Sequence, residues 1–171
     1  MKTQPIQVTP SIEPFDIDEV FELLRKAVSK FPKAAMFDLR DRGYDSPFEQ
    51  LVGSLISART RDETTLKVCE RLFSEAKTPE QISALGEQRL AQLLHGASFP
   101  EPKARDLIAI ANRLIQEFAG EVPSEYRELL SFRGVGPKIA ALTLAVGFGQ
   151  PMISVDIHVH RITNRWGYVR T

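Results

Sequence analysis

The sequence of 171 residues is poor in cysteine and contains no long apolar run. Its single cysteine, Cys69, excludes an internal disulfide and a metal cluster built from several cysteines within these residues. No apolar stretch approaches the roughly 18 residues that a membrane-spanning helix needs, and the acid-containing N-terminus is not expected to be a signal peptide. With 43% hydrophobic and 26% charged residues, the composition is that of a globular protein and excludes collagen-like and low-complexity chains.

The sequence also lacks net charge, because 22 basic side chains balance 22 acidic ones. A balance of zero argues at first against a nucleic-acid partner. The charges are unevenly distributed, however: residues 1–132 carry 17 basic and 21 acidic side chains, whereas residues 133–171 carry five basic and one acidic. A basic C-terminal segment therefore follows an acidic one, and a nucleic-acid partner is not excluded.

Apolar residues recur at helical spacing along almost the whole chain, and no convincing β-hairpin pattern is present. Capping patterns with glycine or proline stops delimit eight to ten short helices, so the predicted fold class is all-α. Pro32 is expected to end the first helix, residues 33–45 to form a polar connection and residues 97–102 a rigid loop. The predicted helix starts lie at Asp16, Ser46, Thr60, Thr78, Glu87 and Asp156.

The most informative stretch of the chain is Leu-Ser-Phe-Arg-Gly-Val-Gly-Pro-Lys-Ile-Ala-Ala, at positions 130–141. Gly134 and Gly136 lie between two short predicted helices, where glycine permits positive φ and the close approach of another backbone. Pro137 presets the first turn of the second helix, whose N–H groups and dipole suit a phosphate. Such a hairpin would bind a nucleic-acid backbone without reading its bases. An ordinary connection between two helices is the alternative.

Lys138 follows the hairpin, in the first turn of the second predicted helix. A cation there faces the positive end of the helix dipole, which costs a few tenths to about 1 kcal/mol. The dipole and partial burial would both lower the pKa of the amine, as a nucleophilic lysine requires. Lowering that pKa from about 10.4 to near neutrality takes about 4 kcal/mol, so burial or another cation must add to the dipole.

Asp156 is a second acid–base candidate, because it follows a short apolar run and opens the last predicted helix. An aspartate at that position is a good N-cap residue, which is one sufficient reason for its presence. The functional alternative is a carboxylate at the rim of a cleft, facing the hairpin.

Together these motifs closely resemble those of the endonuclease III family, which comprises helix-hairpin-helix DNA glycosylases with associated abasic-site lyase activity. The resemblance covers about residues 16–171 and includes the 18 positions that separate Lys138 from Asp156. The matching segments are Ser46-Pro-Phe-Glu49, Leu55-Ile-Ser-Ala-Arg-Thr-Arg-Asp62, Gly120-Glu-Val-Pro123, Gly134-Val-Gly-Pro-Lys138 and Val155-Asp-Ile-His158.

The resemblance implies two helical domains with a DNA cleft between them. The expected six-helix domain spans residues 35–150, with its helix-hairpin-helix at about 125–147. The second domain would combine an N-terminal helix at 16–34 with the start of its C-terminal part at 151–171, and it would be incomplete in this chain. Residues 1–15 are expected to be disordered or extended.

The resemblance also implies roles for the two candidate catalytic residues. The amine of Lys138 would attack C1′ of a damaged nucleotide, expel the base and form a Schiff base whose β-elimination nicks the strand. Asp156 would stabilise positive charge on the sugar and help to move protons. The expected activity is removal of oxidised pyrimidines with lyase action. The alternatives are a catalytically silent helix-hairpin-helix DNA-binding fragment and a monofunctional mismatch glycosylase, which Lys138 argues against.

The remaining candidate residues are expected to contact DNA. Arg59 lies where the family usually fills the gap left by an extruded nucleotide with glutamine, and Phe99 where an apolar wedge, usually leucine, lies beside the orphaned base. A helix C-cap role for Arg59 and a core-capping role for Phe99 are the alternatives. His158 belongs to the motif that lines the family's site. The hairpin residues expected to bind the DNA backbone are Arg133, Gly134, Val135, Gly136 and Pro137.

Two of the hairpin residues depart from the family pattern. Arg133 stands where the family commonly has proline, and Pro137 where it often has a basic residue. Because positive charge is moved across the hairpin rather than lost, phosphate binding is expected to survive.

The family usually continues into a segment in which four cysteines hold a [4Fe–4S] cluster. No cofactor is expected to be ligated by this chain, and a cluster is expected only if such a segment is present in the full protein. Cys69 has core spacing and is interpreted as a buried apolar filler. His158 and His160 are two positions apart on a predicted helix, so they point to different faces and no metal site is expected.

The expected partner is double-stranded DNA that contains a damaged base or an abasic site. No membrane partner is expected, and the chain is expected to act as a monomer. Because no targeting signal was recognised, the expected location is the bacterial cytoplasm.

Overall fold

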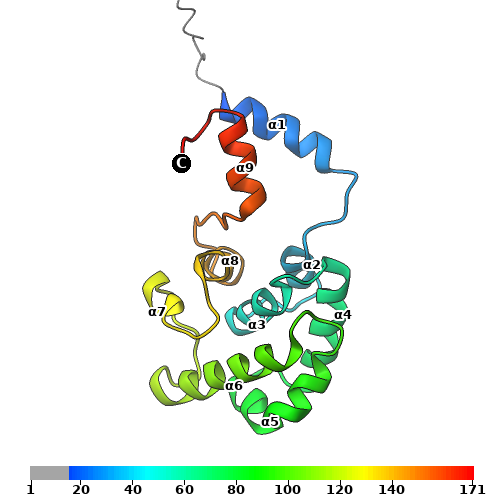
Figure 1. Ribbon diagram of the computed structural model, residues 1–171, viewed down its shortest axis with the longest axis vertical. Coiled ribbons are helices and arrows are strands. Elements are labelled where there is room, and N and C mark those ends of the chain that lie inside the picture. The colour runs from blue at the N-terminus through cyan, green and yellow to red at the C-terminus, as the bar shows by residue number, and fades with distance from the viewer. Residues whose placement is uncertain (1–15) are drawn as a thin grey trace, which may run out of the picture. The chain divides into compact units, whose positions relative to one another are not determined.

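The computed structural model describes residues 16–171, and the prediction for residues 1–15 lies outside this range. Within it the chain forms nine α-helices and no β-strand, which confirms the all-α fold class. The described residues divide into a smaller unit, taken from 16–32 and 156–171, and a larger unit, 33–155. The smaller unit contains α1 (Ile17–Val28) and α9 (Ile157–Arg165). The larger unit contains α2 (Ala35–Asp41), α3 (Pro47–Ser57), α4 (Asp62–Phe73), α5 (Pro79–Leu93), α6 (Pro100–Glu117), α7 (Tyr126–Leu130) and α8 (Pro137–Gly147), as Figure 1 shows.

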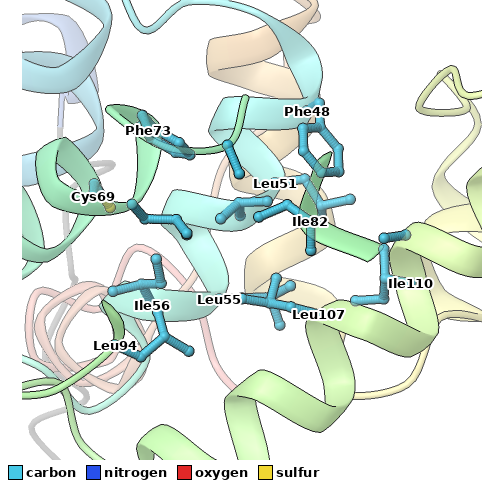
Figure 2. Close-up of a cluster of buried hydrophobic side chains, with 14 of the residues drawn as sticks. Phe48, Leu51, Leu55, Ile56, Cys69, Phe73, Ile82, Leu94, Leu107 and Ile110 are labelled. Carbon is cyan, nitrogen blue, oxygen red and sulfur yellow. The ribbon is translucent and has the colours of Figure 1, made fainter. Parts of the chain in front are cut away.

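Helix α3 forms the centre of the larger unit. Every residue from Phe48 to Ile56 is buried, as expected for a helix that is apolar nearly all round. α3 packs against α8 and contacts α2, α4 and α6, while α5 and α6 lie side by side (Figure 1). Figure 2 shows side chains of α3 in one buried cluster with Cys69 of α4 and Leu107 of α6, so Cys69 is a core residue as predicted.

The start of α3 follows the local sequence signal in full. Ser46 Oγ accepts a hydrogen bond from the Glu49 N–H at 3.2 Å, and Glu49 Oε2 accepts one from the Ser46 N–H at 3.2 Å. Pro47 occupies the first helical position, where its missing N–H costs nothing. This reciprocal pair satisfies two N–H groups that the helix itself cannot bond, and it therefore fixes the start of the central helix.

The prediction of a polar connection at residues 33–45 is wrong, because α2 lies there. α2 has no side-chain cap of its own. Instead, the Ala35 N–H donates to the carboxylate of Asp62 at the start of α4, at 3.1 Å. Met36 and Leu39 are buried in the core, and a Cβ added at Gly53 would lie 2.7 Å from the Met36 Cε. The helix is thus stabilised by residues distant in sequence.

Three predicted helix boundaries also shift. α4 has Arg61 as its N-cap residue, so the predicted cap by Thr60 is wrong and its hydroxyl has other partners. α6 begins at Pro100, inside the segment predicted to be a rigid loop. α1 ends at Val28 rather than at Pro32. By contrast, the prediction of two separate helices that start at Thr78 and Glu87 is confirmed, since φ +71° at Gly86 divides α5 into two helical stretches.

The two helices of the smaller unit are amphipathic and have strong caps. Asp16 caps α1 by accepting hydrogen bonds from the N–H groups of Asp18 and Glu19, and Asp156 caps α9. No residue of either helix is buried. No helix within residues 16–171 is both long and apolar enough to cross a membrane. The large apolar residues exposed along the two helices are Phe21, Leu23, Val28, Ile157, Val159 and Ile162.

Candidate functional site

The hairpin between α7 and α8 has the local geometry that the two glycines predict. Gly134 has φ +78°, a backbone conformation that residues with a side chain rarely adopt. Gly136 has φ −94° and serves as the N-cap residue of α8 without a side chain, so only one of the two glycines uses positive φ. Val135 between them is 6% exposed and anchors the hairpin in the core, so any DNA contact at this position would be made by its backbone. Pro137 begins α8 as predicted.

Asp106 of α6 lies directly against the hairpin. A Cβ added at Gly134 would lie 2.9 Å from Asp106 Oδ2, so the Asp106 carboxylate would have to shift, and the positive φ independently favours glycine there. Arg133 pairs with the same carboxylate, with 2.7 Å between its Nε and Asp106 Oδ1. The arginine predicted to contact a phosphate therefore already has a carboxylate partner in this structure.

A second arginine, Arg113 of α6, holds the turn that follows α7 and precedes the hairpin. The Arg113 guanidinium lies 4.7 Å from the ring centroid of Phe132 and 5.7 Å from that of Phe118. It also donates to the Ser131 carbonyl oxygen at 3.1 Å. Because α6 packs on α5 and contacts α3, these contacts connect the hairpin to the core of the larger unit.

Lys138 lies in the first turn of α8 and is exposed. The burial that was expected to help activate its amine is therefore absent from this structure. The Ser154 hydroxyl donates to the Lys138 carbonyl oxygen at 3.1 Å, which ties the segment after α8 back to the start of that helix. α8 itself is well anchored, because Ala140, Ala141 and Leu144 are buried.

Arg59 and Phe99, predicted separately, come together in the larger unit. The Arg59 guanidinium lies 5.6 Å from the Phe99 ring centroid. Both residues have left-handed backbones, with φ +60° and +57°, a conformation that costs of order 1–3 kcal/mol in a residue other than glycine. Phe99 is 57% exposed, so the core-capping alternative is wrong, and the C-cap of α3 is Ala58 rather than Arg59.

The loops that carry this pair are bonded to each other. Ser98 Oγ donates to the Arg59 carbonyl oxygen at 2.7 Å, and the Ser98 N–H donates to Thr60 Oγ1 at 3.1 Å. Sequence reasoning missed a third partner, Lys103 of α6, whose side chain is buried beside these loops. A lysine next to the apolar positions of an otherwise amphipathic helix is the signal that could have identified it.

In the smaller unit, the structure confirms Asp156 as the N-cap residue of α9. Its Oδ1 accepts hydrogen bonds from the N–H groups of His158 and Val159, at 2.9 and 3.0 Å. The His158 side chain is exposed, and His160 Nε2 lies 2.8 Å from the Thr171 hydroxyl.

Residues 16–171 contain no group of three or more His, Cys, Asp or Glu side chains that could hold a metal ion. The residues present do not fit a four-cysteine cluster, because the one cysteine, Cys69, is buried among apolar side chains of the larger unit. Burial raises the pKa of its thiol to about 12, so the thiol is neutral at pH 7.

Comparison with known proteins defines the class to which this fold and hairpin belong. A family model described as HhH-GPD superfamily base excision DNA repair protein matches residues 52–171. This range includes the Arg59 and Phe99 loops, the hairpin, Lys138 and Asp156. The chain is therefore a helix-hairpin-helix protein of the base excision DNA repair class.

Relatives of known sequence define the family more narrowly. Endonuclease III of Thermotoga maritima is 37% identical over 150 residues, which are 88% of this chain and 67% of that protein. Endonuclease III of Treponema pallidum is 41% identical over 120 residues, which are 70% of this chain and 57% of that protein. The chain belongs to the endonuclease III family of base excision repair DNA glycosylases, and it spans about six tenths of the length of these relatives.

Solved structures match the same fold. A non-covalent endonuclease III–DNA complex superposes with a TM-score of 0.76 at 30% identity, covering 90% of this chain and 69% of that one. A trapped covalent endonuclease III–DNA intermediate gives a TM-score of 0.75 with the same identity and coverage. A thermostable thymine-DNA glycosylase reaches 0.74 at 18% identity, which shows the shared fold alone.

Proposed function

We propose that the chain carries the catalytic residues of a bifunctional DNA glycosylase and abasic-site lyase that removes oxidised pyrimidines from duplex DNA. The observation that carries this proposal is the position of Lys138, which is exposed in the first turn of a well-anchored helix directly after the glycine hairpin. A lysine amine next to a phosphate-binding hairpin would meet the sugar of a nucleotide whose phosphates the hairpin holds. The match to endonuclease III bound to DNA supports DNA as the partner.

The proposed reaction begins at the amine of Lys138. In its neutral form the amine donates its electron pair to C1′ of the damaged nucleotide, and the bond between C1′ and the base nitrogen breaks. The base leaves with the electron pair of the broken bond and takes up a proton, while the bound amine loses a proton. The bond between C1′ and O4′ then opens, O4′ is protonated, and an iminium links Lys138 to the sugar.

Strand cleavage follows from this iminium. Loss of a proton at C2′ expels the phosphate from C3′, and water later hydrolyses the link to Lys138. We assign the carboxylate of Asp156 to stabilise positive charge on the sugar as the base departs and to carry protons during these steps. This assignment rests on the motif spacing from Lys138 and on the carboxylate being fixed by two N–H donors. His158 belongs to the same motif and is proposed to line the site.

The larger unit supplies the proposed DNA contacts. The N–H groups at the start of α8, with Gly136 leaving room for close approach, would bind a phosphate without reading bases. Arg133 can join them only if its guanidinium binds the phosphate and the Asp106 carboxylate together, or leaves the carboxylate for the phosphate. Arg59 and Phe99 are proposed to enter the duplex where the extruded nucleotide was, with the exposed ring stacking on a neighbouring base.

Borohydride trapping tests the lyase assignment directly, because it reduces the iminium to a stable bond. A duplex with one abasic site should yield a covalent adduct with the unchanged chain and none with Lys138→Ala. Lys67→Ala is the matched control, since Lys67 is also exposed on a helix of the larger unit. An adduct that persists in Lys138→Ala would contradict the assignment. Release of the base from a duplex that carries an oxidised pyrimidine, without any adduct on the abasic duplex, would indicate a monofunctional glycosylase. Binding of DNA without base release or an adduct would indicate a silent DNA-binding fragment.

A further inference from the structure

Lys103 of α6 is a buried lysine with no role in the proposed chemistry. Its side chain is 9% exposed, and Nζ lies 2.6 Å from the Ile56 carbonyl oxygen, 2.9 Å from that of Ala58 and 3.2 Å from Thr60 Oγ1. An ammonium group has three N–H donors and no acceptor, so these three oxygens match its hydrogen-bonding capacity in full. A charge is seldom buried unless its partners are as complete as this.

Two of these oxygens belong to the end of α3. The last carbonyl groups of a helix have no partner within it, and the helix dipole places negative charge there. A cation is therefore favourable at this end. Because Lys103 belongs to α6, its hydrogen bonds join the C-terminal end of α3 to α6, next to the loop that contains Arg59.

The third oxygen connects Lys103 to the loop before α6. Thr60 Oγ1 also accepts the Ser98 N–H, and the Ser98 hydroxyl donates to the Arg59 carbonyl oxygen. One network of hydrogen bonds thus runs from Lys103 to the Ala58 carbonyl oxygen before Arg59 and to the Thr60 hydroxyl after it. From that hydroxyl it continues to Ser98, the residue before Phe99, and through Ser98 to the carbonyl oxygen of Arg59 itself. Left-handed conformations in residues other than glycine persist only where surrounding contacts hold them. This network supplies such contacts at both positions.

We infer that Lys103 is a positioning residue for the Arg59–Phe99 pair, holding both loops in the conformation in which the pair can enter DNA. The inference rests on the proposed function, since it assumes that the pair occupies the space of an extruded nucleotide. Lys103 touches neither the sugar nor the base in this account. Its loss should therefore impair insertion into the duplex and leave the amine chemistry at Lys138 intact.

The electrostatics of Lys103 agree with this role. Burial lowers its pKa to about 8, so the folded chain holds the ammonium at a cost that the three hydrogen bonds do not fully offset. An apolar side chain at this position would avoid that cost. Groups retained against stability are typical of functional sites.

The test compares Lys103→Met with Lys67→Met on two duplexes that carry the same oxidised pyrimidine, one stably paired and one mismatched. Methionine keeps a similar length and removes the three donors. Extruding a mismatched base costs less, so insertion matters less there. Lys103→Met should slow single-turnover base release at least about tenfold on the paired duplex and no more than about threefold on the mismatched one. Lys103→Arg should restore part of the loss, and Phe99→Ala should show the same preference.

A fluorescence measurement separates insertion from chemistry. 2-Aminopurine placed opposite an abasic site becomes brighter when a side chain unstacks it, so Lys103→Met should reduce the increase seen on binding of the unchanged chain. Borohydride trapping on that abasic duplex should proceed as in Lys67→Met. Equal losses on both lesion duplexes, with unchanged fluorescence, would overturn the inference.

Two milder variants keep the test decisive if Lys103→Met does not fold. Thr60→Val and Ser98→Ala each remove part of the network without opening the core, and the same pattern with smaller losses is expected. A loss on neither duplex would overturn the inference. If the unchanged chain neither releases the base nor forms an adduct, the proposed function fails, and the fluorescence change still reports whether Lys103 positions the inserted pair.

Discussion

The two units of this chain are stabilised in different ways. In the larger unit, helices with weak local signals are held by contacts from distant residues, as α2 is held by the Asp62 carboxylate and by burial of Met36 and Leu39. In the smaller unit, α1 and α9 have strong N-caps and clear apolar stripes, yet none of their residues is buried. Local signals thus specify a helix, whereas burial provides most of its stability.

The largest expected contrast between the units concerns buried leucines. Leu51 of α3 is fully buried, so Leu51→Ala should lower the free energy of unfolding by about 2–5 kcal/mol. Leu23 of α1 is 57% exposed, and Leu23→Ala should change it by less than about 0.5 kcal/mol. Urea denaturation followed by circular dichroism measures both. Similar losses in the two variants would show that α1 contributes to the cooperative core.

A smaller effect concerns pH and the buried lysine. The pKa of Lys103 is about 8 in the folded chain against 10.5 as its ordinary value, so the unfolded chain binds more protons between these two values. The contribution of Lys103 to the free energy of unfolding therefore rises with pH across that window. Relative to Lys103→Met, the unchanged chain should gain about 2 kcal/mol between pH 7.5 and pH 9.5. Burial also raises the pKa of the Cys69 thiol from 9.0 to about 12, so this thiol lowers the free energy of unfolding as the pH rises through 9, but both chains contain it and its effect cancels in the comparison.

Parallel urea titrations of the two chains at both pH values measure this difference. Titrations that shift equally with pH in both chains would contradict a lowered pKa at Lys103.

The smallest expected contrast compares the two N-caps. Ser46→Ala removes one half of the reciprocal pair at the start of α3 and should cost about 1 kcal/mol of unfolding free energy. Asp16→Ala removes a cap of similar strength from α1, but it should fray that helix with little change in the main transition. Amide hydrogen exchange at the N-termini of the two helices resolves both effects. Equal shifts of the main transition would place α1 in the same cooperative unit as α3.

The same division explains what the sequence could predict. Helices α3, α8 and α9 are marked by residues next to their own starts, namely Ser46, Pro137 and Asp156, and all three were predicted. α2 was missed because its cap, Asp62, lies 27 residues away. Thr60 was misassigned as a cap because its hydroxyl bonds across the fold.

The candidate site follows the same rule. The hairpin and Lys138 are contiguous in sequence, so their motif identifies them together. The place of Lys103 next to the apolar positions of α6 could indicate that it is buried, but its partners lie 43 to 47 residues away and no local pattern reveals which they are. The stacking of Arg59 on Phe99 likewise depends on how two loops meet, although the family motif had identified each residue separately.

Peptide mapping of the borohydride-trapped complex tests whether Lys138 is the nucleophile. After trapping on an abasic duplex, digestion of the protein and the DNA followed by mass spectrometry locates the amine that carries the sugar remnant. We expect a single modified residue, Lys138, on the peptide that begins after Arg133. A sugar remnant on any other amine, or no remnant where base release is measured, would contradict it.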